Sequence, residues 1–319
     1  MKFLFIIVNN QCNIACSYCF YSTGYQQRSL LRINKNKIKK LASTIKKLKF
    51  NGVILTGGEP LHRIWKNETY LLIRELKKRK IKILLNTSAT FLNDSDLDKI
   101  SKLKVDRLDI SIDSHIPEIN DNQRGRFRDV VSAINGLILR GYKNLSTTTV
   151  VTKNNASSLS ETINWIHSLG ISDAKVQRAF FPGKIARKKI SEKKIMDAMK
   201  KIVRKLNYPH SRAYINLTGA IFQNNTKLLN SLAPNIFCCM GKKYFVCDSS
   251  GNLTPCFHRS DIKLGNLFND TILEINSRLE NNALSREKKL PKCFGAHCVS
   301  LFDNKNFWKK NEKNSSLSL

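Results

Sequence analysis

The sequence predicts an α/β protein, a partial (β/α)6 TIM-type barrel followed by a small cysteine-rich domain at the C-terminus. Three observations support this prediction. Short apolar runs alternate with amphipathic helical stretches through residue 178. A cysteine motif follows the first apolar run, and a Gly-Gly-Glu-Pro turn follows the second. Of the nine cysteines, those outside the first motif all fall between residues 238 and 298.

The expected strands are short apolar runs, and the expected helices have apolar residues three or four positions apart. Regular alternation of the two indicates a parallel sheet with right-handed crossovers. Six units are too few for an eight-stranded barrel, so we expect an open one, with its chemistry at the carboxyl ends of the strands. The expected strands cover 3–8, 52–55, 81–85, 107–112, 147–152 and 173–178, and the expected helices cover 35–49, 68–80, 94–103, 128–140 and 159–169.

The composition bounds the partners of the protein. Its formal net charge of +31 would suit a polyanion such as nucleic acid. However, lysine, asparagine and isoleucine are abundant throughout, and the lysine clusters lie on predicted helix faces, so we expect no nucleic-acid partner. No stretch approaches the roughly 20 apolar residues of a membrane span, and residues 1–8 are too short for a signal peptide. We therefore expect a cytoplasmic protein with no membrane partner.

The first cysteine motif, Cys12-x3-Cys16-x2-Cys19, places three thiols within eight residues. Thiolates favour zinc, Cu(I) or iron–sulfur clusters. A closed structural zinc site needs four ligands, and no histidine or fourth cysteine lies nearby. A [4Fe–4S] cluster with three cysteine ligands would leave one iron open to a ligand that is not protein. A zinc loop remains the alternative at this point.

With Tyr18 just before its last cysteine, this run resembles the signature of the radical S-adenosylmethionine (SAM) superfamily. The resemblance implies a [4Fe–4S] cluster on Cys12, Cys16 and Cys19, whose open iron binds the amino and carboxylate groups of SAM. It also implies an electron donor such as flavodoxin or ferredoxin. One electron would cleave SAM to a 5′-deoxyadenosyl radical, which takes a hydrogen from a substrate.

The Gly-Gly-Glu-Pro turn ends the second predicted strand. Its glycines permit backbone geometry that a side chain would forbid, so that carbonyl groups can approach a ligand closely. In the radical SAM superfamily the corresponding segment binds the amino group of SAM. The resemblance therefore assigns Gly57, Gly58 and Glu59 to SAM binding.

Further candidates follow the fourth predicted strand. Alternation places Ser111 and Asp113 on one face, towards the interior, where related proteins place polar groups beside SAM; strand-end caps are the alternative. Arg124 resembles the arginine that pairs with the SAM carboxylate in related peptide maturases, and a guanidinium group suits that carboxylate. A surface arginine is its alternative. No residue is assigned to acid–base catalysis. Weaker candidates of the same kind are Asn86, Thr87 and Thr152.

The C-terminal cysteines form a second predicted site. Residues 248–251 predict a β-turn between two short strands. Such a hairpin would bring Cys238 and Cys256 together, and Cys293 and Cys298 can complete a site with four thiolates.

Cys238-x12-Gly251-x4-Cys256, followed by Leu-Gly-Asn at 264–266, resembles the auxiliary-cluster domain called SPASM, or twitch in its shorter form. The resemblance implies one auxiliary [4Fe–4S] cluster. Cys239 and Cys247 remain unplaced, because either could replace a ligand or be a buried thiol. A zinc ribbon with four cysteines is the alternative for this domain.

We expect a radical SAM core at 1–210, an auxiliary-cluster domain at 211–303 and a disordered tail at 304–319. The combined pattern most resembles maturases of ribosomally made peptides, which crosslink or epimerise residues. The absence of a peptide-binding module before the first strand weighs against a peptide substrate. The alternatives are a radical SAM oxidase or dehydrogenase of a small molecule and, from another class, a basic zinc-ribbon nucleic-acid-binding protein.

Overall fold

A computed structural model describes residues 1–19, 33–178, 214–215, 241–257 and 259–282, and all structural statements concern these residues. The strands of the barrel are β1 (Phe3–Ile7), β2 (Gly52–Thr56), β3 (Lys82–Thr87), β4 (Arg107–Ser111), β5 (Leu145–Val151), β6 (Ala174–Arg178) and β7 (Tyr214–Ile215). The helices between them are α1 (Lys35–Lys47), α2 (Lys66–Lys78), α3 (Asp94–Leu103), α4 (Pro117–Gln123), α5 (Phe127–Leu139) and α6 (Leu159–Ser168). None of the described helices is long and apolar enough to cross a membrane.

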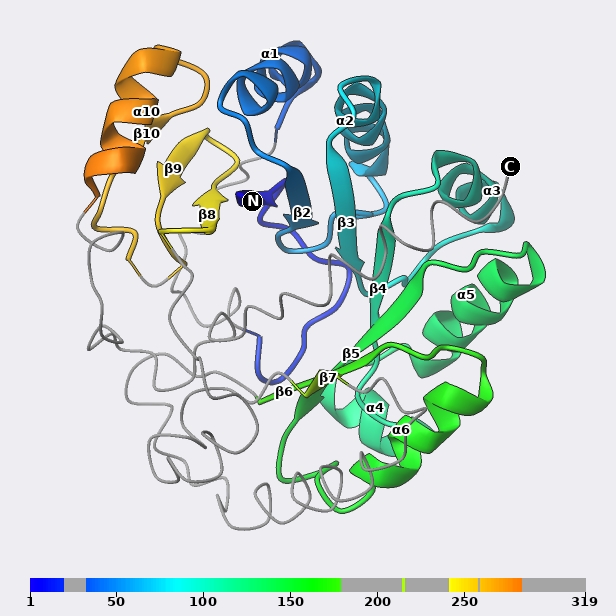
Figure 1. Ribbon diagram of the computed structural model, residues 1–319. Helices are drawn as coiled ribbons and strands as arrows, with labels where there is room; N and C mark the ends of the chain where they lie inside the picture. Colours follow the sequence, from blue (N-terminus) through cyan, green and yellow to red (C-terminus); the bar gives the residue numbers. More distant parts are fainter. Residues whose placement is uncertain (20–32, 179–213, 216–240, 258, 283–319) are drawn as a thin grey trace.

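All strands in the described residues belong to one ten-stranded sheet in the order β10-β9-β8-β1-β2-β3-β4-β5-β6-β7. Strands β1 to β6 are neighbours in sequence order and pair in parallel, which confirms the six predicted strands. The sheet curves, and the helices between these strands cover its outer face (Figure 1). The carboxyl ends of the strands therefore meet at one edge of an open barrel.

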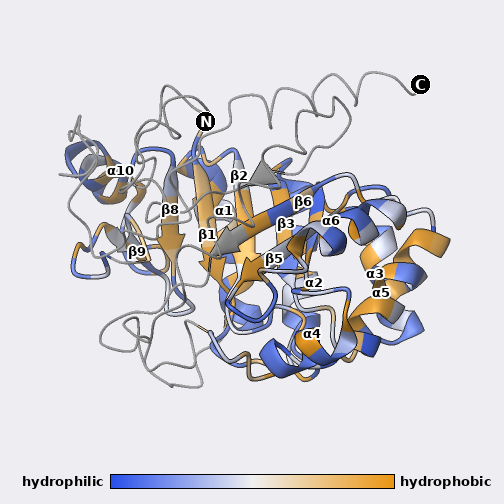
Figure 2. Cartoon of the chain, turned by 90° about the horizontal axis from the view of Figure 1, so that it is seen from below, coloured by the Kyte–Doolittle hydropathy of each residue, from blue (hydrophilic) through white to orange (hydrophobic). Residues whose placement is uncertain are grey.

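Alternate residues of the strands face the helices and form one large apolar core. Leu4 and Ile6 on β1, like Leu108 and Ile110 on β4, are almost completely buried in it. The strands β1, β2 and β8 are predominantly hydrophobic in Figure 2. The intervening residues, such as Asp109, lie on the concave face. This face is the one available to a substrate.

The C-terminal part continues the same sheet. Strand β8 (Tyr244–Cys247) pairs in parallel with β1, and β9 (Asn252–Thr254) pairs antiparallel with β8. The turn between them is closed by a hydrogen bond from the Gly251 N–H to the Asp248 carbonyl at 2.9 Å, which confirms the predicted hairpin. Strand β10 (Gly265–Asn266) and helix α10 (Ile272–Asn281) follow.

Helix α4 was not expected from the sequence. Residues 114–126 contain no apolar stripe, and the buried side chains of the helix are the polar Asn120 and Gln123. Pro117 occupies the first turn, where a missing N–H is tolerated. Hydrophobic periodicity cannot detect such a helix, because it is held by hydrogen bonds to neighbouring loops.

Candidate functional site

The cysteine loop, residues 12–19, leaves the end of β1 and crosses the mouth of the barrel. At its start, the Glu59 N–H donates to the Gln11 carbonyl at 2.6 Å. Towards its end, the Ser17 N–H donates to the carbonyl of Gln123, the last residue of α4, at 2.8 Å. The loop is therefore tied by its backbone to the turn after β2 and to α4.

The two glycines of the Gly-Gly-Glu-Pro turn lie directly against residues 9–11, which lead into this loop. A Cβ at Gly58 would lie 2.0 Å from the Gln11 carbonyl oxygen, and one at Gly57 would lie 2.4 Å from the Asn9 carbonyl oxygen. Gly57 also has φ of +143°, which side chains rarely adopt. The sequence suggested that these glycines admit a ligand. In the structure they admit the backbone that leads into the cysteine loop.

Glu59 is buried, and its carboxylate is fully occupied by hydrogen bonds. One oxygen accepts from the Leu61 N–H at 2.8 Å and from the Thr87 hydroxyl at 2.6 Å. The other accepts from the N–H and the hydroxyl of Ser88, both at 2.6 Å. This side chain joins the turn after β2 to the end of β3, so its predicted contact with SAM would have to involve its backbone.

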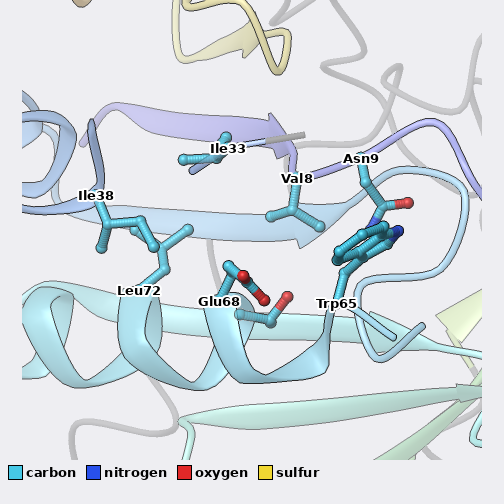
Figure 3. Close-up of a pocket in the computed structure, with 8 residues that line it drawn as sticks. Val8, Asn9, Ile33, Ile38, Trp65, Glu68 and Leu72 are labelled. Atoms are coloured by element: carbon cyan, nitrogen blue, oxygen red, sulfur yellow. The ribbon is translucent and has the colours of Figure 1, made fainter. Parts of the chain in front are cut away.

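A small pocket lies between the end of β1 and helix α2, beside the base of the cysteine loop (Figure 3). The indole N–H of Trp65, which lines this pocket, donates to the Gln11 side chain. The residues labelled in Figure 3 are Val8, Asn9, Ile33, Ile38, Trp65, Glu68 and Leu72. This lining is mostly apolar and contains no cysteine, so the pocket is not a site for a cluster.

The thiols of the cysteine loop influence one another electrostatically. Desolvation and, after it, the Glu59 carboxylate raise the pKa of Cys12 to about 12. Desolvation raises the pKa of Cys16 to about 11 against the opposing effect of Arg124. Charges on Cys16 and Cys19 also raise the pKa of Cys12.

The three thiols of the cysteine loop are the donor set for the cluster that the sequence predicts. No three His, Cys, Asp or Glu side chains in the described parts of the chain already form a metal-binding group. Three neighbouring thiolates nevertheless repel one another unless a cation neutralises them, and thiolates are the ligands of iron–sulfur clusters. The residues present therefore fit such a cluster, and its binding would release protons from Cys12 and Cys16.

The structure brings together Asp113 and Arg124, two residues that the sequence nominated. The Arg124 Nε lies 3.3 Å from an Asp113 carboxylate oxygen, and both side chains are buried. The Tyr18 hydroxyl donates to the same carboxylate. Arg124 is therefore not a surface arginine. Asp113 also accepts a hydrogen bond from the Val150 N–H near the end of β5, so the strand-end alternative stays open for it, and both side chains lie under the cysteine loop.

Ser111 lies on the concave face and is partly exposed. Among the weaker candidates, Thr87 donates to Glu59 and Thr152 donates to the Gln123 side chain. The side-chain oxygen Oδ1 of Asn86 is buried and has no hydrogen-bond partner in the described part of the chain. Ser111 and Asn86 therefore present polar atoms that a ligand could use, and their roles stay predictions.

A charged cluster on the concave face was not predicted from the sequence. Asp109 of β4, 2% exposed, accepts hydrogen bonds from Lys175 of β6 and from the Thr148 hydroxyl at 2.8 Å. Nearby, Arg107 pairs with Asp173 at 2.7 Å. Desolvation opposes ionisation, but Lys175 and Arg107 hold the pKa of Asp109 below its usual value. Extending the alternation of Ser111 and Asp113 backwards along β4 would have found it.

The described C-terminal cysteines lie on opposite faces of the sheet. Cys247 is fully buried in the main core, where burial raises the pKa of its thiol. Cys256 packs on the concave side against Ile7 and Val246. This arrangement favours the interpretation of Cys247 as a buried thiol rather than a ligand. The other predicted members of this site, Cys238, Cys239, Cys293 and Cys298, lie outside the described residues.

Comparison with known families gives two matches. The model of the radical SAM superfamily matches residues 6–166, from β1 to the end of α6. The model of SPASM, described as an iron-sulfur cluster-binding domain, matches residues 238–299. Together they imply the predicted cofactors, a SAM-binding [4Fe–4S] cluster, SAM itself and auxiliary iron–sulfur ligation.

Curated relatives are similar over part of the chain. A probable GTP 3′,8-cyclase of Methanococcus aeolicus is 26% identical over 172 residues, which cover 54% of this chain and 57% of the relative. The mycofactocin maturase MftC of Mycolicibacterium smegmatis is 24% identical over 152 residues, which cover 47% of this chain and 38% of the relative. The chain thus spans less than two thirds of the length of these relatives.

Among solved structures, SuiB of Streptococcus suis bound to S-adenosylmethionine aligns with a TM-score of 0.70 at 16% identity. The alignment covers 89% of this chain and 66% of SuiB. A second structure shows SuiB bound to the precursor peptide SuiA, with a TM-score of 0.68. At this identity the likeness concerns the fold, and it confirms the predicted partial barrel with a C-terminal cysteine-rich domain.

Proposed function

Because the chain belongs to the radical SAM superfamily and carries a SPASM domain, we propose that it modifies a ribosomally made peptide by radical chemistry, forming a crosslink or an epimerised residue. One observation carries this proposal. Three interacting thiols lie on a loop seated against Gly57 and Gly58, at the carboxyl edge of a parallel sheet. This is the edge at which barrels of this kind place their chemistry.

The cofactors supply the difficult step, which is the one-electron cleavage of SAM to a radical that abstracts hydrogen. The residues of the chain bind and orient the cofactors and the substrate. Arg124 uses Nε and Nη2 within the protein, and its Nη1 has no hydrogen-bond partner among the described residues. We propose that Nη1 holds the SAM carboxylate and that the partly exposed Ser111 contacts SAM beside it.

The concave face supports a peptide as substrate because its two halves differ in character. Near β1 and β8 it is aromatic: the Phe5 ring lies 5.1 Å from that of Phe257 and 6.0 Å from that of Tyr244. Near β4 to β6 it is polar, with Lys175 paired to Asp109. An extended peptide offers apolar side chains to the first half and backbone amides to the second. The names of MftC and of the SuiA-bound SuiB point the same way.

The alternative is a small-molecule substrate. Several curated relatives are named GTP 3′,8-cyclases, and the polar half of the concave face would also suit a small polar molecule. We further propose flavodoxin or ferredoxin as the electron donor. The cytoplasm is the expected compartment, because free thiols stay reduced there.

The test is release of 5′-deoxyadenosine by anaerobically reconstituted protein supplied with a chemical reductant. We expect release from the wild type and none from Cys16→Ala, which lacks one cluster ligand. Adding a peptide encoded beside the gene should raise the release and give a modified peptide, whereas adding GTP should not. A wild type that binds iron and never cleaves SAM would refute the hypothesis of radical chemistry. Turnover of GTP but of no peptide would favour the alternative.

A further inference from the structure

Three side chains from two distant parts of the chain meet beneath the cysteine loop, and we call Tyr18, Asp113 and Arg124 the loop anchor. The Tyr18 hydroxyl donates to Asp113. Arg124 Nη2 donates to the Tyr18 hydroxyl oxygen at 2.5 Å and to the second Asp113 oxygen at 3.3 Å. The guanidinium carbon lies 5.6 Å from the centroid of the Tyr18 ring. Each member thus contacts both others.

The loop anchor is buried, and Asp113 has no capacity for another partner. The exposed fractions are 0% for Asp113, 8% for Tyr18 and 9% for Arg124. Besides the anchor contacts, the Val150 N–H donates to Asp113 at 2.9 Å, so each carboxylate oxygen accepts two hydrogen bonds. Buried charges persist only when they are paired and hydrogen-bonded. Asp113 is therefore committed to the protein, although the sequence suggested that it lies beside SAM.

The loop anchor acts on the segment that carries two of the thiols. Tyr18 lies between Cys16 and Cys19, and its ring packs with Cys16 and Val150 in a small apolar cluster. The Ser17 N–H is bound to the Gln123 carbonyl, directly before Arg124. The first part of the loop, with Cys12, is instead held by the turn after β2. Different parts of the barrel therefore hold the two ends of the cysteine loop.

We propose that Asp113 and Arg124 are positioning residues, which fix Cys16 and Cys19 through Tyr18 before any cluster is assembled. This inference rests on the proposed function for its purpose, because a fixed loop matters when its thiols share one cluster. The contacts of the loop anchor themselves do not depend on a cluster or on SAM. Loss of an anchor contact frees residues 16–19 to open locally while Cys12 stays in place.

The test compares Tyr18→Phe and Arg124→Lys with the wild type. Tyr18→Phe removes only the hydroxyl and leaves the buried Asp113–Arg124 pair intact; Arg124→Lys keeps the charge but loses the planar fork. The control is Asp129→Asn, which breaks the exposed Arg126–Asp129 pair nearby. In protein without a cluster, alkylation of each cysteine by iodoacetamide is followed by mass spectrometry.

We expect Cys16 and Cys19 to react roughly 10- to 100-fold faster in both variants, the range for loss of one hydrogen bond to a charged group. Cys12 should react at the wild-type rate, and Asp129→Asn should change nothing. After anaerobic reconstitution, both variants should also differ from wild type in the paramagnetic resonance spectrum of the reduced cluster.

Unchanged rates at Cys16 and Cys19 in both variants would overturn the inference, as would equal acceleration at Cys12. These outcomes are separable from the proposed function, because alkylation needs neither iron nor SAM. A wild type that takes up no iron but shows the expected pattern of alkylation would refute the function and leave the loop anchor standing.

Discussion

Replacing Gly58 by alanine tests whether the cysteine loop is seated on the Gly-Gly turn. The added methyl would lie 2.0, 2.4 and 2.8 Å from the carbonyl oxygen, the carbonyl carbon and the nitrogen of Gln11. All three are backbone atoms, so no side-chain rotation can relieve the contact. The cheapest response is for the loop to lift away from the turn.

Lifting the loop breaks two backbone hydrogen bonds, from the Gly58 N–H to the Asn9 carbonyl at 2.9 Å and from the Glu59 N–H to the Gln11 carbonyl at 2.6 Å. At about 1 kcal/mol each, this loss costs about 2 kcal/mol, which lies within the range of about 1–3 kcal/mol for overpacking. A domain of this size then loses about 4–8 °C in Tm. Iron uptake should fall strongly even though most of the protein stays folded, because the three thiols no longer lie together.

The assay measures thermal unfolding of the protein without iron, and iron per chain after anaerobic reconstitution. The matched control is Gly136→Ala in α5, whose methyl would lie 2.6 Å from Leu97 Cδ1, the end of a flexible side chain. That variant should keep its iron, with a change in Tm of a few degrees at most. Full iron uptake by Gly58→Ala, or equal loss of iron by Gly136→Ala, would refute the reasoning.

Three other predictions follow from the buried polar and thiol groups. Cys256→Ala should lower the iron content. Cys247→Ala should keep the iron content and lose about 1 kcal/mol or more of stability, because it leaves a small cavity. Loss of iron from Cys247→Ala would show that Cys247 is a ligand. Lys175→Met should destabilise the protein by about 3–5 kcal/mol in chemical denaturation, because Asp109 is left buried and unpaired, and a second change, Asp109→Asn, should restore part of the loss; no restoration would contradict the pairing. The pKa of Asp109 is lowered in the folded state, so its contribution to the free energy of unfolding is present above its unfolded pKa of about 3.9 and is lost as pH falls through the lower folded value. Denaturation of wild type and Asp109→Asn at several pH values should show that their difference in unfolding free energy shrinks in that acid window. A difference independent of pH would contradict this prediction.

The strands could be predicted because their apolar runs are continuous. The apolar residues that mark these runs, such as Leu4, Ile6, Leu108 and Ile110, are the ones that the core buries. The cysteine motif could also be predicted, since its three thiols lie close together in the sequence within one loop. Helix α4 could not be found in this way, because its buried residues are polar.

The contacts of the nominated residues could not be predicted, because they depend on neighbours distant in sequence. Tyr18 and Asp113 are 95 residues apart, and Glu59 meets Ser88 only because β2 and β3 are adjacent. Lys175 was hidden for another reason: in a chain with 55 lysines and arginines, one more lysine carries no signal. Burial, rather than residue type, distinguishes it from the others.

The pairing of β8 with β1 has a consequence for how the chain folds and how it can be divided. β1 is made before β8, yet it becomes an interior strand only when residues 244–247 dock beside it. Until then it presents the open edge of an apolar strand to other nascent chains. A fragment ending at residue 210 would keep that edge permanently, and we expect it to aggregate on expression. The C-terminal hairpin therefore covers this edge of the barrel, and its contribution to a metal site through Cys256 stays a prediction.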